Sequence, residues 1–272
     1  MEEALADEFG WATKATNQTL IRAAVNEKAQ RLGLPPADYC QLAAASQSEL
    51  LALAEATAIG ETSFFNAPQQ FAFLRQTLLP QLLQDCPSDQ PLRLWSAACA
   101  TGEEAYSLAM TVSQVQSQNP AATVEILATD VRNHALLRAS RARYPAAALA
   151  ALDESVRAQF FERVGEDEAE GGGSYLVTSA ARRLVVFRRL NLFDRLYWRG
   201  VNKRFDLIVC ANVLSMLHRI AVRQLVAHFS QALRAGGYLM VAPTEAGLVH
   251  SNKLTPLAEE PSFFQKNTGQ KN

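Results

Sequence analysis

The chain contains 272 residues, 49% of them hydrophobic and 19% charged, and carries a formal net charge of -1 at pH 7. This composition predicts a globular protein with one large domain, alone or beside a smaller one. The balanced charge argues against a broad phosphate-binding surface, so we expect no nucleic acid partner. Because no apolar run reaches the roughly 18 residues of a membrane-spanning helix, we expect neither a signal peptide nor membrane insertion.

The first part of the chain, up to about residue 80, is rich in Ala, Leu and Gln with helical spacing, as in NQTLIRAAVNEKAQRLGL and QSELLALAEATA. This pattern predicts a small helical region. The turn-rich run QDCPSDQP follows it. We therefore expect an N-terminal helical domain with its linker over residues 1–84 and a second domain over residues 85–272.

The second domain alternates short β-rich runs with amphipathic stretches. The predicted strands are LRLWSA, TVEILATD, RLVVFRRLNLF, FDLIVCANV and GYLMVAPTE. The predicted helices between them cover residues 103–116, 133–143 and 220–234. Strands that alternate with helices predict an α/β fold in which a parallel sheet is covered by helices on both faces.

One segment interrupts this alternation. The run FFERVGEDEAEGGGSYLVTSAARRLVVF has an acidic, glycine-rich centre between two β-rich flanks. The centre by itself is typical of a surface loop. The flanks favour a small antiparallel insertion, which we place at about residues 158–188.

A turn of small residues follows the first predicted strand, in the run SAACATGEE. Such a turn lets a ligand approach the backbone, and the helix after it offers unpaired N–H groups. Neither a P-loop nor a GxGxxG motif is present, and Glu103 and Glu104 would repel a phosphate. The turn therefore favours a cationic or uncharged ligand of the adenosine type. The alternative is that both glutamates only complement the helix dipole.

Polar residues also end the later predicted strands. Asp130 ends the second strand, where an acidic residue can accept hydrogen bonds from ribose hydroxyls. The alternative for Asp130 is a helix cap. Asn191 and Asn212 follow two further strands. Because parallel strands end at one edge of the sheet, these side chains predict a shared pocket there.

The cysteines and histidines carry no comparable signal. Cys40, Cys86, Cys99 and Cys210 form no CxxC pair, which is typical of reduced thiols in a cytoplasmic protein. The four histidines have no ligand spacing with one another or with the cysteines. We therefore expect no metal site.

Six runs, in order between about residues 59 and 245, resemble the motifs of CheR-type chemotaxis receptor methyltransferases, which are protein-glutamate methyltransferases: ETSFFN, LWSAACATGEEAYSLAM, LATDV, NLFD, FDLIVCANV and LRAGGYLMVAPTEAG. The resemblance implies a small N-terminal helical domain and a Rossmann-like class I domain that binds S-adenosylmethionine and releases S-adenosylhomocysteine. It also implies an inserted three-stranded β-subdomain, which in some members docks a receptor tail.

The resemblance assigns residues to the cofactor by their positions in these motifs. It places Thr62 near the cofactor, the turn from Ala98 to Glu103 at its amino-acid half, and Asp130 at its ribose. The adenine and the methionine part would be flanked by two residue pairs, Asn191 with Leu192 and Asn212 with Val213.

Two transfer-site positions depart from the family pattern. An arginine is expected after the Phe-Phe pair and a tyrosine four residues after the strand-end asparagine, but this chain has Asn66 and Met216 there. The resemblance implies a protein-glutamate O-methyltransferase of chemotaxis-like receptors in signal transduction. The departures leave two alternatives open, a non-catalytic regulator that binds the cofactor and a methyltransferase with a changed acceptor.

The implied partner is a chemoreceptor-like or other protein acceptor, docked through the β-subdomain. The helical domain of the family presents a basic face to glutamate-rich receptor helices. Residues 1–50 of this chain hold four basic and seven acidic residues, a balance of -3. This balance argues against a strongly basic docking surface.

Overall fold

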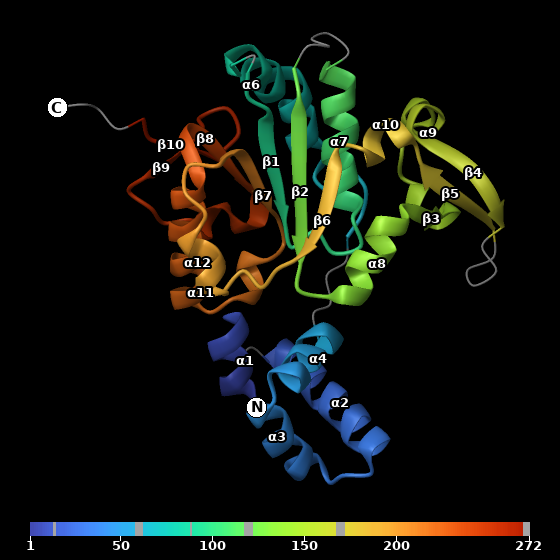
Figure 1. Ribbon diagram of the computed structural model, residues 1–272, viewed down its shortest axis with the longest axis vertical. Coiled ribbons are helices and arrows are strands. Elements are labelled where there is room, and N and C mark those ends of the chain that lie inside the picture. Colours follow the sequence, from blue (N-terminus) through green and yellow to red (C-terminus); the bar gives the residue numbers. More distant parts are fainter. Residues whose placement is uncertain (13–14, 58–61, 88, 117–121, 167–171, 269–272) are drawn as a thin grey trace.

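The computed structural model describes residues 1–12, 15–57, 62–87, 89–116, 122–166 and 172–268 (Figure 1). Its helical domain lies below a large sheet, and a second, small sheet lies to one side. Within these residues, no helix is both long enough and apolar enough to span a bilayer.

The N-terminal domain contains four helices. They are α1 (Glu2–Phe9), α2 (Ala15–Leu32), α3 (Pro36–Ala45) and α4 (Gln47–Thr57). Apolar side chains from all four form one core, in which Leu5, Tyr39 and Leu53 are fully buried. The predicted helical domain is therefore present, and its last helix ends at Thr57.

The next helical stretch, which the sequence placed with the helical domain, packs against the sheet. It comprises α5 (Pro68–Phe73), a π-helical turn η1 (Leu74–Leu78) and α6 (Leu79–Asp85). Its leucines share a core with Leu92 and Leu94 of the first strand. The stretch therefore belongs to the sheet domain, although its helical pattern resembles that of the first four helices. Helical periodicity does not show which neighbour an apolar face packs against.

The central sheet has seven strands in the order β6-β2-β1-β7-β8-β10-β9. The first five of these run parallel. Their bounds are β1 (Leu92–Ala97), β2 (Val124–Asp130), β6 (Val185–Arg189), β7 (Phe205–Cys210) and β8 (Leu233–Val241). The chain moves outward from β1 to one side through β2 and β6, and to the other through β7 and β8. The strand order therefore reverses beside β1, which is where open sheets of this kind bind ligands.

Alternate residues of the strands face two separate cores. Leu94 and Leu207 pack on one face with α7 (Glu103–Gln116) and α6. On the other face, Trp95 and Ile208 pack with α11 (Arg195–Arg199) and α12 (Arg219–Ala232). The helix α8 (Asn133–Arg141) covers β2 and β6. The predicted sheet with helices on both faces is confirmed.

The C-terminal edge of the sheet departs from the predicted parallel order. Strands β10 (Phe263–Lys266) and β9 (Leu254–Pro256) both pair antiparallel. They are short and lack a clear alternation of apolar and polar residues, so the sequence analysis assigned no strands there. Strand β10 pairs with the edge of β8, and β9 pairs in turn with β10.

The predicted antiparallel insertion is present, and its strands lie between Arg143 and Val177, whereas the sequence placed it at about residues 158–188. Its sheet has the order β3-β5-β4. The strands are β3 (Arg143–Pro145), β4 (Phe161–Glu166) and β5 (Gly173–Val177). A short turn η2 (Ala146–Leu149) and α9 (Glu154–Phe160) connect β3 to β4. Strand β3 has three residues and no pattern of its own, and it forms by pairing with β5. Beyond α10 (Ser179–Arg182), Val185–Arg189 pairs with β2 in the central sheet instead.

Candidate functional site

The turn between β1 and α7 has an unusual backbone. Ala98 and Ala100 adopt positive φ angles of 64° and 49°, and Gly102 one of 99°. A Cβ atom at Gly102 would lie 2.9 Å from the Cβ of Ala139 and from the hydroxyl oxygen of Tyr144, so only glycine fits. Left-handed conformations are costly for alanine and often occur at functional sites.

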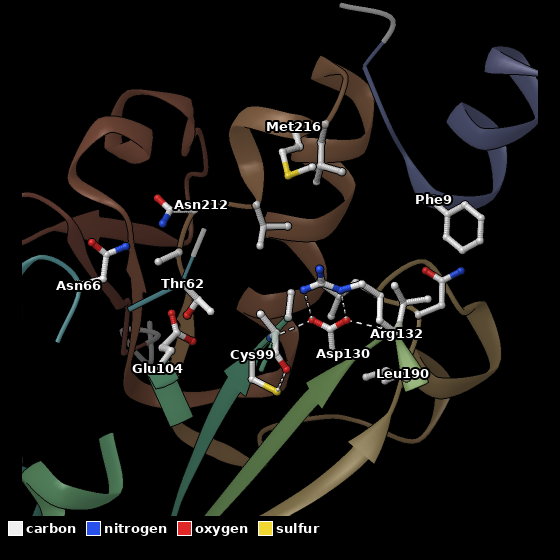
Figure 2. A pocket seen from close by; sticks show the side chains of 18 of the residues that line it. Phe9, Thr62, Asn66, Cys99, Glu104, Asp130, Arg132, Leu190, Asn212 and Met216 are labelled. Carbon is white, nitrogen blue, oxygen red and sulfur yellow. Dashed lines mark hydrogen bonds and ion pairs between the residues drawn. The ribbon is translucent and has the colours of Figure 1, made fainter. Parts of the chain in front are cut away.

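A cavity opens beside this turn, at the carboxyl ends of β1, β2, β6 and β7 (Figure 2). It brings together most of the residues that the sequence analysis assigned to the site. Those that line it are Thr62, Asn66, Ala98, Asp130, Asn191, Leu192, Asn212, Val213 and Met216. Residues from five separate parts of the chain therefore meet at one edge of the sheet.

Asp130 joins β2 to the turn after β1. Its side chain is nearly fully buried, and one carboxylate oxygen accepts a hydrogen bond from the backbone N–H of Ala100 at 2.9 Å. The other oxygen accepts from the backbone N–H and the Nε of Arg132, at 2.9 and 3.0 Å. Asp130 therefore holds both the turn and Arg132 in place while it faces the cavity (Figure 2).

The two glutamates of α7 lie differently with respect to the cavity. Glu104 lines the cavity, whereas Glu103 does not. The Glu103 carboxylate accepts a hydrogen bond from the Thr101 hydroxyl at 2.7 Å and interacts with the side chain of Thr62. Successive helix residues point about 100° apart, so only one of two neighbours can face the cavity. The sequence shows both carboxylates but not the rotation of the helix about its axis.

Burial affects both carboxylates. It raises the pKa of Glu103 above its ordinary value. It also raises the pKa of Glu104 to about 7, although a hydrogen bond from the Ser96 hydroxyl opposes the shift. The negative charge of Glu245 adds to the rise at Glu104. A cation bound beside Glu104 would favour its ionised form.

Glu245 positions the loop after β7, and the sequence analysis did not assign it to the site. It is fully buried in the turn η4 (Pro243–Leu248). Its carboxylate accepts hydrogen bonds from the backbone N–H of Asn212 at 2.9 Å, and from the backbone N–H and hydroxyl of Ser215 at 2.8 Å each. The available signal was a carboxylate four residues after the end of the apolar strand β8.

The two asparagines at the strand ends have different environments. The Asn191 amide nitrogen donates to the Glu8 carbonyl at 3.1 Å, and its amide oxygen accepts from the Phe193 N–H at 2.9 Å. Asn212 is exposed and has a positive φ of 62°. Asn191 therefore joins the helical domain to the sheet, while Asn212 presents its side chain at the cavity (Figure 2).

Asn66 and Met216 face the cavity from two different loops. Asn66 lies between Phe65 and Ala67, which both have positive φ angles, and the Phe65 N–H donates to the Ser107 hydroxyl at 2.8 Å. Met216 ends the turn η3 (Leu214–Met216).

Figure 2 shows Asn66, Thr62 and Glu104 at one end of the cavity and Phe9 at the other. Among the lining residues, Phe9 and Trp11 had no local sequence signal.

Two of the thiols are buried in the described part of the chain, and one histidine caps a helix. Burial raises the pKa values of Cys99 and Cys210 well above the ordinary value, so both thiols stay protonated at neutral pH. The Nδ1 of His218 caps α12 by accepting from the Ala221 N–H at 3.2 Å. No group of three potential metal ligands occurs among the described residues.

The cavity has the chemistry that S-adenosylmethionine requires. A carboxylate at the end of β2 can accept from ribose hydroxyls, apolar side chains can enclose a base, and Glu104 can pair with a cation. The sheet order, the inserted β-subdomain and this site define a class I S-adenosylmethionine-dependent methyltransferase, as the sequence predicted.

A family model described as "CheR methyltransferase, SAM binding domain" matches residues 60–263. The chain therefore belongs to the CheR methyltransferase family, and its cofactor is S-adenosylmethionine. The matched residues begin before α5 and include the helices that pack against the sheet.

Named relatives agree with this family. The "Probable chemotaxis protein methyltransferase" of Rhizobium etli is 30% identical over 236 residues, which cover 85% of each chain. "Chemotaxis protein methyltransferase 1" of Pseudomonas aeruginosa is 33% identical over 71% of this chain and 68% of its own. Among solved structures, the DszA carbon methyltransferase is 15% identical with a TM-score of 0.39, and the match covers 88% of this chain and only half of that one. A likeness of this size says nothing about the substrate.

Proposed function

We propose that the chain transfers a methyl group from S-adenosylmethionine to the γ-carboxylate of glutamate side chains in a receptor-type protein of the cytoplasmic signalling machinery. The observation that supports this most directly is the cavity itself, which holds strand-end polar groups at its inner edge and Asn66 and Met216 at positions matching the family's transfer site. Relatives named chemotaxis protein methyltransferases support the acceptor class. The family match disfavours a non-catalytic regulator.

The residues that would hold the cofactor follow from their chemistry. Asp130 would accept from the ribose hydroxyls, and Leu192 and Val213 would contact the adenine. The turn at Ala98 and the carboxylate of Glu104 would hold the methionyl end. We assign this last role to Glu104 and not to Glu103, because only Glu104 reaches the cavity.

The reaction does not require the protein to act as an acid or a base. When bound, the cofactor supplies a methyl group attached to a positively charged sulfur. The methyl group goes to the acceptor carboxylate, and the sulfur keeps the bonding electrons as a neutral thioether. A glutamate side chain with an ordinary pKa near 4.3 is already ionised at neutral pH, so no general base is needed. The chain's own contribution is to align the acceptor carboxylate and exclude water. Asn66 can donate one neutral hydrogen bond to that carboxylate.

The test is incubation with methyl-labelled S-adenosylmethionine and a membrane fraction that contains receptors. We expect protein-bound label, and we expect alkali to release that label as methanol, because carboxyl methyl esters are base-labile. Protein-bound label that alkali does not release would contradict the glutamate acceptor. It would favour a changed acceptor, an alternative that the uncharged Asn66 already raises.

The raised pKa of Glu104 predicts a pH dependence for cofactor binding. The ionised carboxylate pairs with the ammonium of the ligand, so below pH 7 a proton must leave before the pair forms. We expect S-adenosylhomocysteine to bind about tenfold more weakly at pH 6 than at pH 8. Calorimetric titration across this range measures the effect.

Two substitutions serve as variant and control for this effect. Glu104→Gln removes the titrating group, so the dependence on pH should disappear and binding should stay weak. Glu103→Gln keeps Glu104 and should retain the dependence. Binding that is independent of pH in the unchanged protein would show that Glu104 does not pair with the ligand.

We also propose that the small sheet docks the protein acceptor. Its outer strands, β3 and β4, can add an extended segment as a further strand. Phe64 connects this sheet to the site loop, because its ring contacts those of Tyr144 and Phe161 at centroid distances of 4.8 and 5.1 Å.

Deletion of residues 166–173, with the turn closed, tests this docking. The described part of this segment pairs only within the small sheet. We therefore expect S-adenosylhomocysteine affinity to change less than twofold while methylation of receptor membranes falls. Titration and labelling measure the two effects. Loss of cofactor binding would show that the insertion supports the main fold, and full methylation would contradict docking.

A further inference from the structure

A short segment after α1 crosses the loop that follows β7. The His218 N–H donates to the Gly10 carbonyl at 2.9 Å, and the Ala12 N–H donates to the Met216 carbonyl at 2.9 Å. Trp11 and Leu217 form an antiparallel bridge between these bonds. Residues 9–12, which we name the crossing segment, are therefore attached by backbone pairing to the loop that carries Met216.

The crossing segment places two aromatic rings at the cavity. Phe9 and Trp11 both line it, with ring centroids 6.1 Å apart. Phe9 lies near Arg132 and Leu190, at the end away from Thr62, Asn66 and Glu104 (Figure 2). Asp130 lies between these two ends. A ligand whose ribose meets Asp130 and whose amino-acid part meets Glu104 would therefore place its base beside Phe9.

Close packing fixes the position of the crossing segment. Gly10 has a φ of 70°, and a Cβ atom added there would overlap the Cζ of Phe193 and lie 2.7 Å from the Cβ of Ala221. The segment therefore packs against the loop after β6 and the start of α12. Any larger residue at this position would push it away from both.

A second contact holds the helical domain at the same edge of the sheet. The Glu55 carboxylate of α4 accepts a hydrogen bond from the Asn133 N–H at 3.0 Å, at the start of α8. Asn191 adds its bond to the Glu8 carbonyl. Three points of attachment thus surround the end of the cavity at which Phe9 lies.

We infer that Phe9 and Trp11 form the wall against which the adenine of the cofactor packs, so that cofactor binding and docking of the helical domain stabilise each other. This inference rests on the cofactor placement proposed above. Aromatic side chains bind nucleobases through their faces and edges. Coupling of this kind is reciprocal, because a ligand that binds the docked form more tightly must also favour docking.

The first test compares two glycine substitutions in the helical domain. Gly10→Ala introduces the clash with Phe193 and Ala221. Gly33→Ala is the matched control, because Gly33 has a similar φ of 66° but nothing within 4 Å of an added Cβ. Both variants therefore carry the same backbone strain, and only the first displaces the crossing segment.

The readout is calorimetric titration with two ligands, S-adenosylhomocysteine and methylthioadenosine, which lacks the amino-acid part. For Gly10→Ala we expect affinity for both ligands to fall by about tenfold, while Gly33→Ala stays within twofold of the unchanged protein. Unchanged binding by Gly10→Ala would overturn the inference. A loss confined to S-adenosylhomocysteine would also overturn it, because the effect would then lie at the amino-acid end.

Hydrogen exchange of the unchanged protein provides a measurement that does not depend on a variant folding. We expect S-adenosylhomocysteine to slow exchange of the Ala12 and His218 amides at least fivefold. Equal exchange with and without ligand would overturn the coupling. If the unchanged protein bound neither ligand, the proposed cofactor site would fail together with this inference, whereas normal binding by Gly10→Ala would overturn the inference alone.

Discussion

Replacement of Asn66 by arginine and Met216 by tyrosine in one protein is expected to raise the rate of glutamate methylation by about thirty- to 150-fold. Charge-assisted hydrogen bonds are roughly twice as strong as neutral ones, and one such bond at a transfer site corresponds to ~2–3 kcal/mol in the barrier. The unchanged protein should accordingly methylate ordinary receptor fragments weakly. S-adenosylhomocysteine affinity should stay within twofold, because neither Asn66 nor Met216 is among the residues assigned to the cofactor.

The surroundings of Asn66 make this substitution feasible. Its side chain is exposed at the cavity, so a longer arginine has space. The hydrogen bond from the Phe65 N–H to Ser107 anchors the loop next to it. Phe65 and Ala67 hold positive φ angles on either side, and neither is changed. The backbone at position 66 should therefore keep its direction.

The control is Gln69→Arg, which adds the same charge on an exposed face of α5, at a residue that does not line the cavity. Initial rates with labelled cofactor and a receptor fragment should be unaffected by this control. A high rate in the unchanged protein that the double substitution lowers would show that the site has its own arrangement. Asn66 would then be the residue to test, since Ser215 is bonded to Glu245 and His218 caps α12.

Asp130→Ala is expected to weaken S-adenosylhomocysteine binding by ~1–3 kcal/mol, or about five- to 150-fold. The change removes the proposed ribose acceptor. It also removes the acceptor of the Ala100 N–H and the ion pair with Arg132, so the turn after β1 loses an anchor. Because breaking a buried ion pair is destabilising, the melting temperature should fall as well. Calorimetric titration and thermal unfolding measure the two effects.

Asp206→Ala separates these effects. Asp206 is buried like Asp130, accepts from the Arg93 N–H at 2.6 Å and pairs with Arg234. It lies near the start of β7, at the opposite end of the sheet from the cavity. This variant should lose stability but bind S-adenosylhomocysteine normally. Equal loss of affinity in both variants would mean that Asp130 acts only through the fold.

Local patterns were sufficient for the elements that position the site. The runs around β1, α7 and β2 predicted their bounds to within about one residue, because each carries its own apolar periodicity and ends at a turn of small or polar residues. The motif series was sufficient for the class of fold, the family and the cofactor. These features lie within short stretches of chain, so neighbouring residues contain the information.

Tertiary packing decided what no short stretch encodes. The helices at residues 68–85 resemble those of the N-terminal domain, yet they bury their leucines against the sheet. Strand β3 forms only because β5 lies beside it. The rotation of α7 decided that Glu104, and not Glu103, faces the cavity.

The sequence by itself determined the parallel strands of the central sheet, the turn after β1 and the polar residues at the strand ends. Only the tertiary structure decided that Phe9 and Trp11, far from those strands in the chain, line the same cavity, and that Glu245 holds the loop of Asn212. The physical reason is that periodicity records whether a side chain is buried. Which distant side chains line one cavity depends on how the helical domain and the two sheets pack together.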